Sequence, residues 1–397
     1  MEYIGKDARM LRAAVVGLLL GALLAGAGAS ERARADSSPF AANAMWIWQL
    51  PKAERGNRLA IVRRARAARI STLFIKAGDG RNNWRQFTPS MLSYFHRKGL
   101  KVCGWHYVYG RRPATEATVS ANAIRDGADC LIIDAEAEYE GRYAAADTYM
   151  TSLREQVGAS TPIGLAGFPY VDYHPSFPYS VFFRPGGAQY NLPQMYWRAI
   201  GTSVERVYTH TYRWNQPYAR PIYPLGQVWQ SPPARDIKRF RRLATAYGAT
   251  GTSWWEWSQA SRSAFKSATR VLSGPPSPRG VDPVTLGRGA RGDVVVWAQE
   301  HLNGAGAGLP VTGNFGSATE TAVESFQLSH GLPVTGLLDP ATWPALLRVA
   351  PASTPWASQP ARRSISARAA SVTAPSATAP ASARLPSKRD ELAVRRR

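Results

Sequence analysis

From residue 43 to about residue 272, short apolar runs alternate with amphipathic segments of helical spacing. This alternation over roughly 230 residues predicts a (β/α)8 TIM-type barrel of the α/β class. A doubly wound open sheet is the alternative, and it is disfavoured because no Gly-rich phosphate-binding loop follows the first run. The expected strands are Met45–Leu50, Thr72–Ala77, Lys101–Tyr109, Cys130–Glu136, Pro162–Gly167, Leu192–Trp197, Pro221–Val228 and Thr252–Trp257.

The fourth expected strand runs directly into a cluster of acidic residues. After the apolar residues 131–133 come Asp134, Glu136, Glu138 and Glu140. Because side chains alternate along a strand, the first three of these acids are expected on one face. Carboxylates that close together cannot all ionise cheaply, so at least one of them is expected to have a raised pKa. Such a pair suits glycosidic bond cleavage, and a metal site or a solvated acidic loop are the alternatives.

Polar and aromatic residues also follow the other expected strands. In a barrel the carboxyl ends of all strands meet at one mouth, so these side chains are expected to line a sugar-binding site there. Each Trp taken singly is more often a core residue than a ligand platform. The expected substrate-binding residues are Trp105, Tyr107, Gln194, Tyr196 and Trp229, and the expected supporting residues are Glu138, Glu256, Lys76 and Asp79.

The two cysteines, Cys103 and Cys130, fall on neighbouring expected strands. A disulfide and a pair of small buried thiols are equally compatible with that placement. Neither their spacing nor their neighbours suggest a metal site, and no cofactor is expected.

Both ends of the chain are expected to lie outside the folded domains. Residues 1–35 have a basic start, an apolar stretch from 13 to 29 and small-residue cleavage positions, which predicts a secretory signal peptide. An uncleaved anchor is the alternative, although the apolar run is short for a membrane span. Residues 349–397 are mostly Ala, Ser, Pro and Arg and are expected to be disordered.

The formal net charge is +22, and much of the excess lies at the ends of the chain. Attraction to an anionic wall polymer, a membrane or nucleic acid is one interpretation, and an Arg-rich composition with basic tails is the preferred one. No nucleic-acid-binding motif accompanies the charge. The expected protein is a secreted monomer without a nucleic-acid partner or stable membrane insertion.

A Pro/Gly/Ser linker at residues 273–284 leads into a second, smaller unit at residues 285–348. This unit contains a repeat with an offset of 23 residues: Pro310–Gly313 and Ala318-Thr319 recur as Pro333–Gly336 and Ala341-Thr342. Each copy combines a turn, a buried apolar residue and a helix start. Helices over 293–302, 317–330 and 340–347 would form a compact three-helix domain.

The small unit resembles the module called peptidoglycan-binding domain 1. The resemblance is carried by Leu286–Gly289, Gly292, Gln299–Leu302, Gly313–Gly316, Phe326-Gln327 and Thr342-Trp343, and it covers the whole unit. It implies binding to cell-wall peptidoglycan. Most of the matched positions form the fold, so no ligand contact is assigned from them.

The barrel is similar in part to the muramidases of glycoside hydrolase family 25. The similar segments are Phe74–Gly80, Gly104–Tyr107 and Asp134-Ala135-Glu136, and the resemblance makes Glu136 the general acid. The family places an Asp on the first strand, where this chain has Trp46–Gln49; Glu256 could substitute for it. The fourth strand is also similar to family 18 chitinases, with Asp129, Asp134 and Glu136 at matching places and Ile132 replacing the central acid.

These patterns predict a secreted bacterial hydrolase of β-1,4 bonds in the cell-wall glycan. Glu136 is expected to protonate the glycosidic oxygen, and Asp134 is expected to stay ionised beside it. Lys76 is expected near the acids, where a structural ion pair with Asp134 is the alternative role. A wall-binding protein whose barrel no longer catalyses is the alternative function, and chitin or an exopolymer is the alternative substrate.

Overall fold

The computed structural model describes residues 38–41, 43–269, 274 and 276–356. The expected signal peptide and most of the expected basic tail therefore lie outside the described residues. Within the described ranges, no helix is long and apolar enough to cross a membrane.

Eight parallel strands form the barrel, in the sheet order β7-β6-β5-β4-β2-β1-β9-β8. Isolated parallel bridges between Asn191 and Ile222 and between Gln194 and Leu225 join the two ends of this sheet, so the ring closes. The short strand β3 pairs antiparallel with the end of β2. The strands are β1 Asn43–Ile47, β2 Thr72–Asp79, β3 Asn82–Asn83, β4 Lys101–Val108, β5 Cys130–Ala135, β6 Ile163–Ala166, β7 Tyr190–Asn191, β8 Leu225–Gln227 and β9 Thr252–Trp255.

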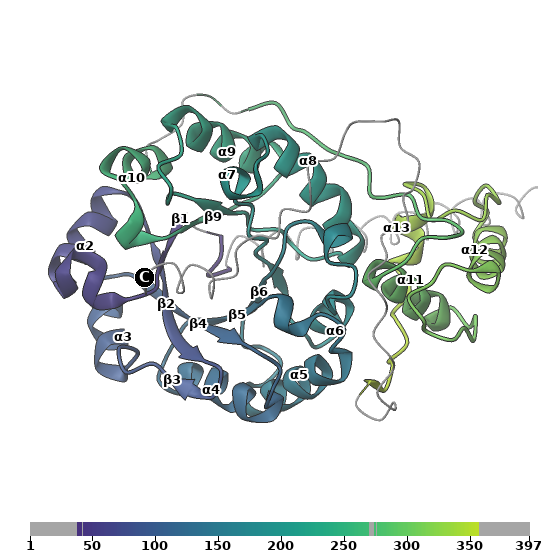
Figure 1. The fold of residues 1–397 in the computed structure, drawn as a ribbon, viewed down its shortest axis with the longest axis horizontal. Coiled ribbons are helices and arrows are strands. Elements are labelled where there is room, and N and C mark those ends of the chain that lie inside the picture. The colour runs from purple at the N-terminus through teal and green to yellow at the C-terminus, as the bar shows by residue number, and fades with distance from the viewer. Residues whose placement is uncertain (1–37, 42, 270–273, 275, 357–397) are drawn as a thin grey trace, which may run out of the picture.

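Helices surround the strands as an outer ring when the molecule is viewed along the barrel (Figure 1). The Thr88 hydroxyl caps helix α3 by accepting from the Met91 N–H, and Pro89 occupies its first position. The barrel helices are α2 Arg58–Ala67, α3 Pro89–His96, α4 Pro113–Arg125, α5 Tyr143–Val157, α6 Tyr179–Phe183, α7 Trp197–Ile200, α8 Val204–Asn215, α9 Ala234–Ala246 and α10 Arg262–Thr269. Short 3₁₀ turns are η1 Leu50–Gly56, η2 Ala137–Tyr139, η3 Val171–Tyr173, η4 Gln216–Tyr218 and η5 Trp257–Gln259.

The interior of the barrel is filled by aromatic side chains. The rings of Trp46, Trp105 and Trp255 lie 5.4–5.6 Å from one another, and none of them is more than 2% exposed. Cys103 and Cys130, which are paired in the β4–β5 register, are joined by a disulfide in the same layer. This interior is a packed core, as parallel barrels of this size require.

The small domain consists of α11 Asp293–Gly304, α12 Ser317–Ser329 and α13 Thr342–Leu346. An antiparallel bridge between Leu286 and Leu338 ties the chain entering the domain to its second repeat. The predicted fold class, a barrel followed by a small helical domain, is confirmed. In Figure 1 the small domain lies beside α6, and α11 is the helix that contacts it.

Two local predictions differ from the structure. The sixth expected strand, Leu192–Trp197, does not form: β7 is Tyr190–Asn191, just before it, and within the expected range only Gln194 makes an isolated bridge. Pro193 interrupts the ladder, and Trp197 already begins α7. The disordered tail was expected to begin at residue 349. Instead residues 349–356 return to the folded unit, where the Ala352 N–H donates to the Glu300 carbonyl and the Trp356 ring lies 4.5 Å from the Tyr143 ring.

Candidate functional site

Asp134 and Glu136 meet at the mouth of the barrel. Asp134 is the second-last residue of β5, and Glu136 follows directly after the strand. The Gln194 side-chain amide donates to both of them, at 3.2 Å to Asp134 Oδ1 and 3.1 Å to Glu136 Oε1. All three side chains are nearly buried, with exposed fractions of 0%, 5% and 6%. One amide group therefore fixes two carboxylates side by side at the end of the strand.

Tyr107 lies among three carboxylates at the same mouth. Its Cα is opposite Asp134 in the β4–β5 register, and its hydroxyl donates to Glu138 Oε2 at 2.8 Å. Burial raises the pKa of Tyr107 far above its usual 10, and the neighbouring charges of Glu136, Glu138 and Asp134 raise it further. The hydroxyl therefore stays protonated and available as a hydrogen-bond donor.

Lys76 and Asp79 form a second polar centre on β2. The Lys76 ammonium lies 2.6 Å from Asp79 Oδ2, and the Tyr109 hydroxyl donates to Asp79 Oδ1 at 2.9 Å. The ammonium also lies 4.4 Å from the centre of the Trp84 ring and 4.8 Å from that of Trp105, within cation–π range. The pairing register of β2 with β4 shifts between residues 76 and 78, and such a bulge re-aims side chains at a strand end.

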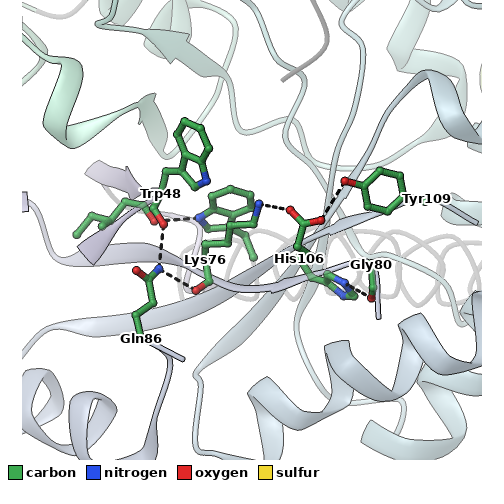
Figure 2. A network of polar contacts seen from close by, with 9 residues as sticks. Trp48, Lys76, Gly80, Gln86, His106 and Tyr109 are labelled. Carbon is green, nitrogen blue, oxygen red and sulfur yellow. Dashed lines mark hydrogen bonds and ion pairs between the residues drawn. The ribbon is translucent and has the colours of Figure 1, made fainter. Parts of the chain in front are cut away.

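Further hydrogen bonds hold the backbone around Lys76 and Asp79 in place (Figure 2). The Gln86 amide donates to the carbonyls of Trp48 and Lys76 at 2.9 and 3.1 Å, and so ties the ends of β1 and β2 together. His106 is fully buried and bonds to the Gly80 carbonyl at 2.9 Å. Burial lowers the pKa of His106 to about 4, so the ring is neutral near pH 7 and acts as a structural group.

The loop after β4 is fixed by one buried carboxylate. Glu116, on α4, is 0% exposed and accepts from four successive backbone N–H groups, those of residues 109–112, at 2.8–3.1 Å. This arrangement satisfies the donors of a tight loop and holds Tyr109 in place beside Asp79.

Glu256 lies in another sector of the mouth. It follows β9, and in the sheet order β9 is separated from β5 by β1, β2 and β4. Its carboxylate accepts from the Ser258 hydroxyl at 2.5 Å, and it is 1% exposed. Burial raises the pKa of the Glu256 carboxyl, and hydrogen bonds from Ser258 partly offset this rise. It occupies the side of the ring where the first strand carries no acid.

The expected sugar-stacking residues divide into two groups. Trp105 is 0% exposed and donates from its indole to the Ile47 carbonyl at 3.2 Å, so it is a core residue and its predicted role as a sugar platform is wrong. Tyr196 and Trp229 lie next to each other, with ring centres 6.3 Å apart in an edge-to-face arrangement. They follow β7 and β8 and lie on the Gln194 side of the ring.

Sequence reasoning missed two supporting residues, Gln86 and Glu116. Both lie outside the strands, and both act on backbone groups that are close only in the folded chain. A local signal exists for Glu116 alone, since an acid in the first turn of α4 is only four to seven residues from the N–H groups that donate to it. Within the described part of the chain, no group of three His, Cys, Asp or Glu side chains is placed to hold a metal ion.

The small domain has a recognisable family. Residues 291–346 match the family model for a putative peptidoglycan binding domain. No curated protein matches the chain. The N-terminal resemblance to family 25 muramidases is not supported by any of these comparisons.

Two solved structures are similar to part of this chain. One is a chitinase from Chromobacterium violaceum ATCC 12472, with a TM-score of 0.42 and 11% identity, over 57% of this chain and 98% of that chain. The other is the chitinase domain of the spore coat protein CotE from Clostridium difficile, with a TM-score of 0.33 and 15% identity, over 46% of this chain and 64% of that chain. Neither likeness is close enough to assign a reaction or a substrate to this chain.

Proposed function

We propose that this protein is a cell-wall glycan hydrolase that acts outside the cytoplasm. The small domain would hold it on peptidoglycan, and the barrel would cleave β-1,4 glycosidic bonds. The observation that carries the proposal is the pair of buried carboxylates, Asp134 and Glu136, fixed by the Gln194 amide at the barrel mouth. Paired acids at that end of a barrel are what glycosidic cleavage requires.

In this mechanism Glu136 donates its proton to the glycosidic oxygen as the bond from that oxygen to the anomeric carbon breaks. Asp134 stays ionised and stabilises the positive charge that develops on the sugar, acting on the ring or on its 2-acetamido group. Water then supplies hydroxide to the anomeric carbon and returns a proton to Glu136. Glu138 and Glu256 are the candidates for activating that water. Tyr107, which holds Glu138 by a hydrogen bond, would keep the first candidate in place.

The test compares the mature protein with its Glu136→Gln variant on insoluble peptidoglycan. New reducing ends and the fraction of bound protein are both measured. Loss of a general acid lowers the rate by about 10²–10⁴-fold, while binding is expected to stay unchanged. Glu155→Gln is the matched control, because Glu155 is an exposed residue of α5 away from the mouth.

A wall-binding protein without catalysis is the second candidate. The first strand favours it, since Trp46 donates to the Ser253 hydroxyl inside the core and no acid stands at that strand end. If the wild type and Glu136→Gln bind equally and neither releases sugar from peptidoglycan or chitin, this second function replaces the first. Release from chitin alone would assign the barrel to that polymer.

A further inference from the structure

The two repeats of the small domain are built around equivalent glutamines. Gln299 Oε1 accepts from the N–H groups of Thr312 and Gly313 at 2.8 and 2.9 Å, and its amide donates to the Asn314 carbonyl at 3.0 Å. Gln327 does the same to Thr335, Gly336 and Leu337 at 2.9, 3.0 and 2.9 Å. The turn residues of the first repeat and their equivalents in the second therefore make the same hydrogen bonds. Equivalent turn residues are 23 positions apart in the sequence, and the two glutamines are 28 positions apart.

The first repeat is attached to the barrel. Asp293, 0% exposed, accepts from the Ser180 N–H, the Ser180 hydroxyl and the Tyr218 hydroxyl at 2.7–2.8 Å. The Trp297 indole donates to the Pro217 carbonyl at 2.6 Å. The N–H of Gly292 donates to the Gly313 carbonyl, so the turn of the first repeat is tied to this contact.

The second repeat presents apolar side chains to solvent at the matching positions. Leu328, Val334 and Leu337 are 73%, 55% and 39% exposed, and they are three of the five large exposed apolar residues among the described part of the chain. We call these three residues the apolar patch. In the first repeat the equivalent positions hold Glu300, which is 5% exposed, the half-buried Val311, and the polar Asn314.

Two members of the apolar patch, Val334 and Leu337, flank the turn residues Thr335 and Gly336, whose N–H groups donate to Gln327. Leu328 is one helical turn after Glu324 on α12, and the Glu324 carboxylate lies next to Gly336 of that turn. Folding leaves the side chains of the patch in water, although the same positions in the first repeat are covered or polar. Exposed aliphatic side chains grouped in this way mark a binding surface.

Two glutamates next to the apolar patch bear on which part of peptidoglycan it could bind. Glu320 and Glu324 lie against Gly336, where a Cβ would be 3.1 and 3.3 Å from their atoms. Arg288 pairs with Glu320, while Glu324 adds negative charge beside the patch. Negative charge disfavours carboxylate-bearing stem peptides, whereas the C–H faces and N-acetyl methyl groups of the sugars are uncharged and fit aliphatic side chains.

We propose that the small domain binds the N-acetylated glycan strands of peptidoglycan through the apolar patch of its second repeat. This proposal rests on the proposed function, since it takes the wall polymer as the ligand. The first repeat would then fix the small domain to the barrel, and the second repeat would bind the glycan.

The test uses the mature full chain in the Glu136→Gln background, so that the polymer is not consumed. A Leu328→Ser/Val334→Ser double variant is compared with its parent in pelleting assays on insoluble peptidoglycan and on chitin, a glycan without peptides. We expect the dissociation constant to rise at least about tenfold on both polymers, because two aliphatic contacts are lost. The Tm is expected to stay unchanged, since both side chains are exposed. Leu59→Ser, at an exposed position on α2, is the control and should bind as the parent does.

Three results would overturn the proposal in different ways. Equal binding of the parent and the double variant removes the patch as the binding surface and leaves peptidoglycan binding intact. Binding of the parent to peptidoglycan but not to chitin means that a group that chitin lacks, the stem peptide or the lactyl ether of muramic acid, is recognised instead of the C–H faces and N-acetyl groups of the sugars. Failure of the parent to pellet with either polymer removes the wall-binding function itself, together with this inference.

Discussion

Glu300 is a carboxyl group that the fold places where ionisation is costly. It is 5% exposed, and burial raises its pKa to about 8, with the nearby Asp293 also raising it; hydrogen bonds from Thr354 and Trp356 act in the opposite direction. A carboxyl whose pKa is higher in the folded than in the unfolded chain binds its proton more tightly in the folded state. Its contribution to stability is therefore complete below about pH 4 and is lost as the pH rises through about 8.

Replacing Glu300 with Gln should remove this loss. The Tm of the wild type relative to Glu300→Gln is expected to fall as the pH rises from about 5 to about 8, by an amount equivalent to roughly 3 kcal/mol, and then to level off. His301, whose pKa burial lowers to about 4, and Asp293, whose pKa burial raises to about 6, titrate in both proteins. Thermal melts across this range measure the difference, and Glu155→Gln serves as the control. Parallel curves for the wild type and Glu300→Gln would contradict the raised pKa.

At the same scale, the sequence predicts the acidic pair better than it predicts the aromatic residues around it. Asp134 and Glu136 are two residues apart on one strand, so the alternation of side chains alone brings them to one face. The same alternation directs Trp105 and Tyr107 inward, but Trp105 is two residues deeper. Depth along the barrel decides whether an inward side chain meets substrate or core, and it depends on the strand registers, which no local pattern encodes.

The turns of the small domain each depend on one side chain for their backbone hydrogen bonds. Gln299 and Gln327 are 1% and 0% exposed, and each accepts from two consecutive N–H groups while donating to a carbonyl. Buried backbone groups without partners are costly, so the two glutamines act as the centres of the two repeats. The repeat was visible in the sequence at the turns, whereas the glutamines follow a different offset and were not linked to it.

Gln327→Ala should therefore destabilise the small domain by about 2–4 kcal/mol, because two N–H groups and one carbonyl lose their partners. Gln299→Ala is expected to cost a similar amount for the same reason. Urea unfolding followed by fluorescence measures both. Gln156→Ala, which changes an exposed glutamine on α5, should shift the midpoint by much less. An effect of Gln327→Ala no larger than that of the control would show that the turn holds without its glutamine.

Strands and helices with long, regular patterns were predicted well, and the elements near the barrel closure were not. The start of α8 is capped by Ser203, whose hydroxyl accepts from the Arg206 N–H. β7 and β8 are only two and three residues long, and the isolated bridges that close the ring come from segments next to them. Their apolar residues read as full strands because burial in the barrel wall gives the same composition.

At the scale of the whole molecule, the small domain is attached to the barrel by specific contacts. The composition of residues 273–284 predicted a linker between the two domains. In its described part, however, the Arg279 N–H donates to the Ala246 carbonyl and Val281 accepts from the Gln216 amide. Asp293 and its partners Ser180 and Tyr218 are 113 and 75 residues apart in sequence, so no local pattern could reveal this contact. The module is thereby held in one orientation relative to the barrel mouth.

Removing the two hydroxyl groups of Ser180 and Tyr218 that donate to Asp293 should release the small domain without altering its own residues. In a Ser180→Ala/Tyr218→Phe variant, the buried carboxylate loses two hydroxyl donors, at a cost of about 3–5 kcal/mol to the contact. We expect trypsin to cleave after Arg279 at least about tenfold faster, because the linker leaves the barrel surface when the domain does. Tyr173→Phe, at an exposed tyrosine, should be cleaved at the wild-type rate. Retained pelleting with peptidoglycan would show that the released domain is still folded, and an unchanged cleavage rate would mean that the remaining contacts are enough to hold the two domains together.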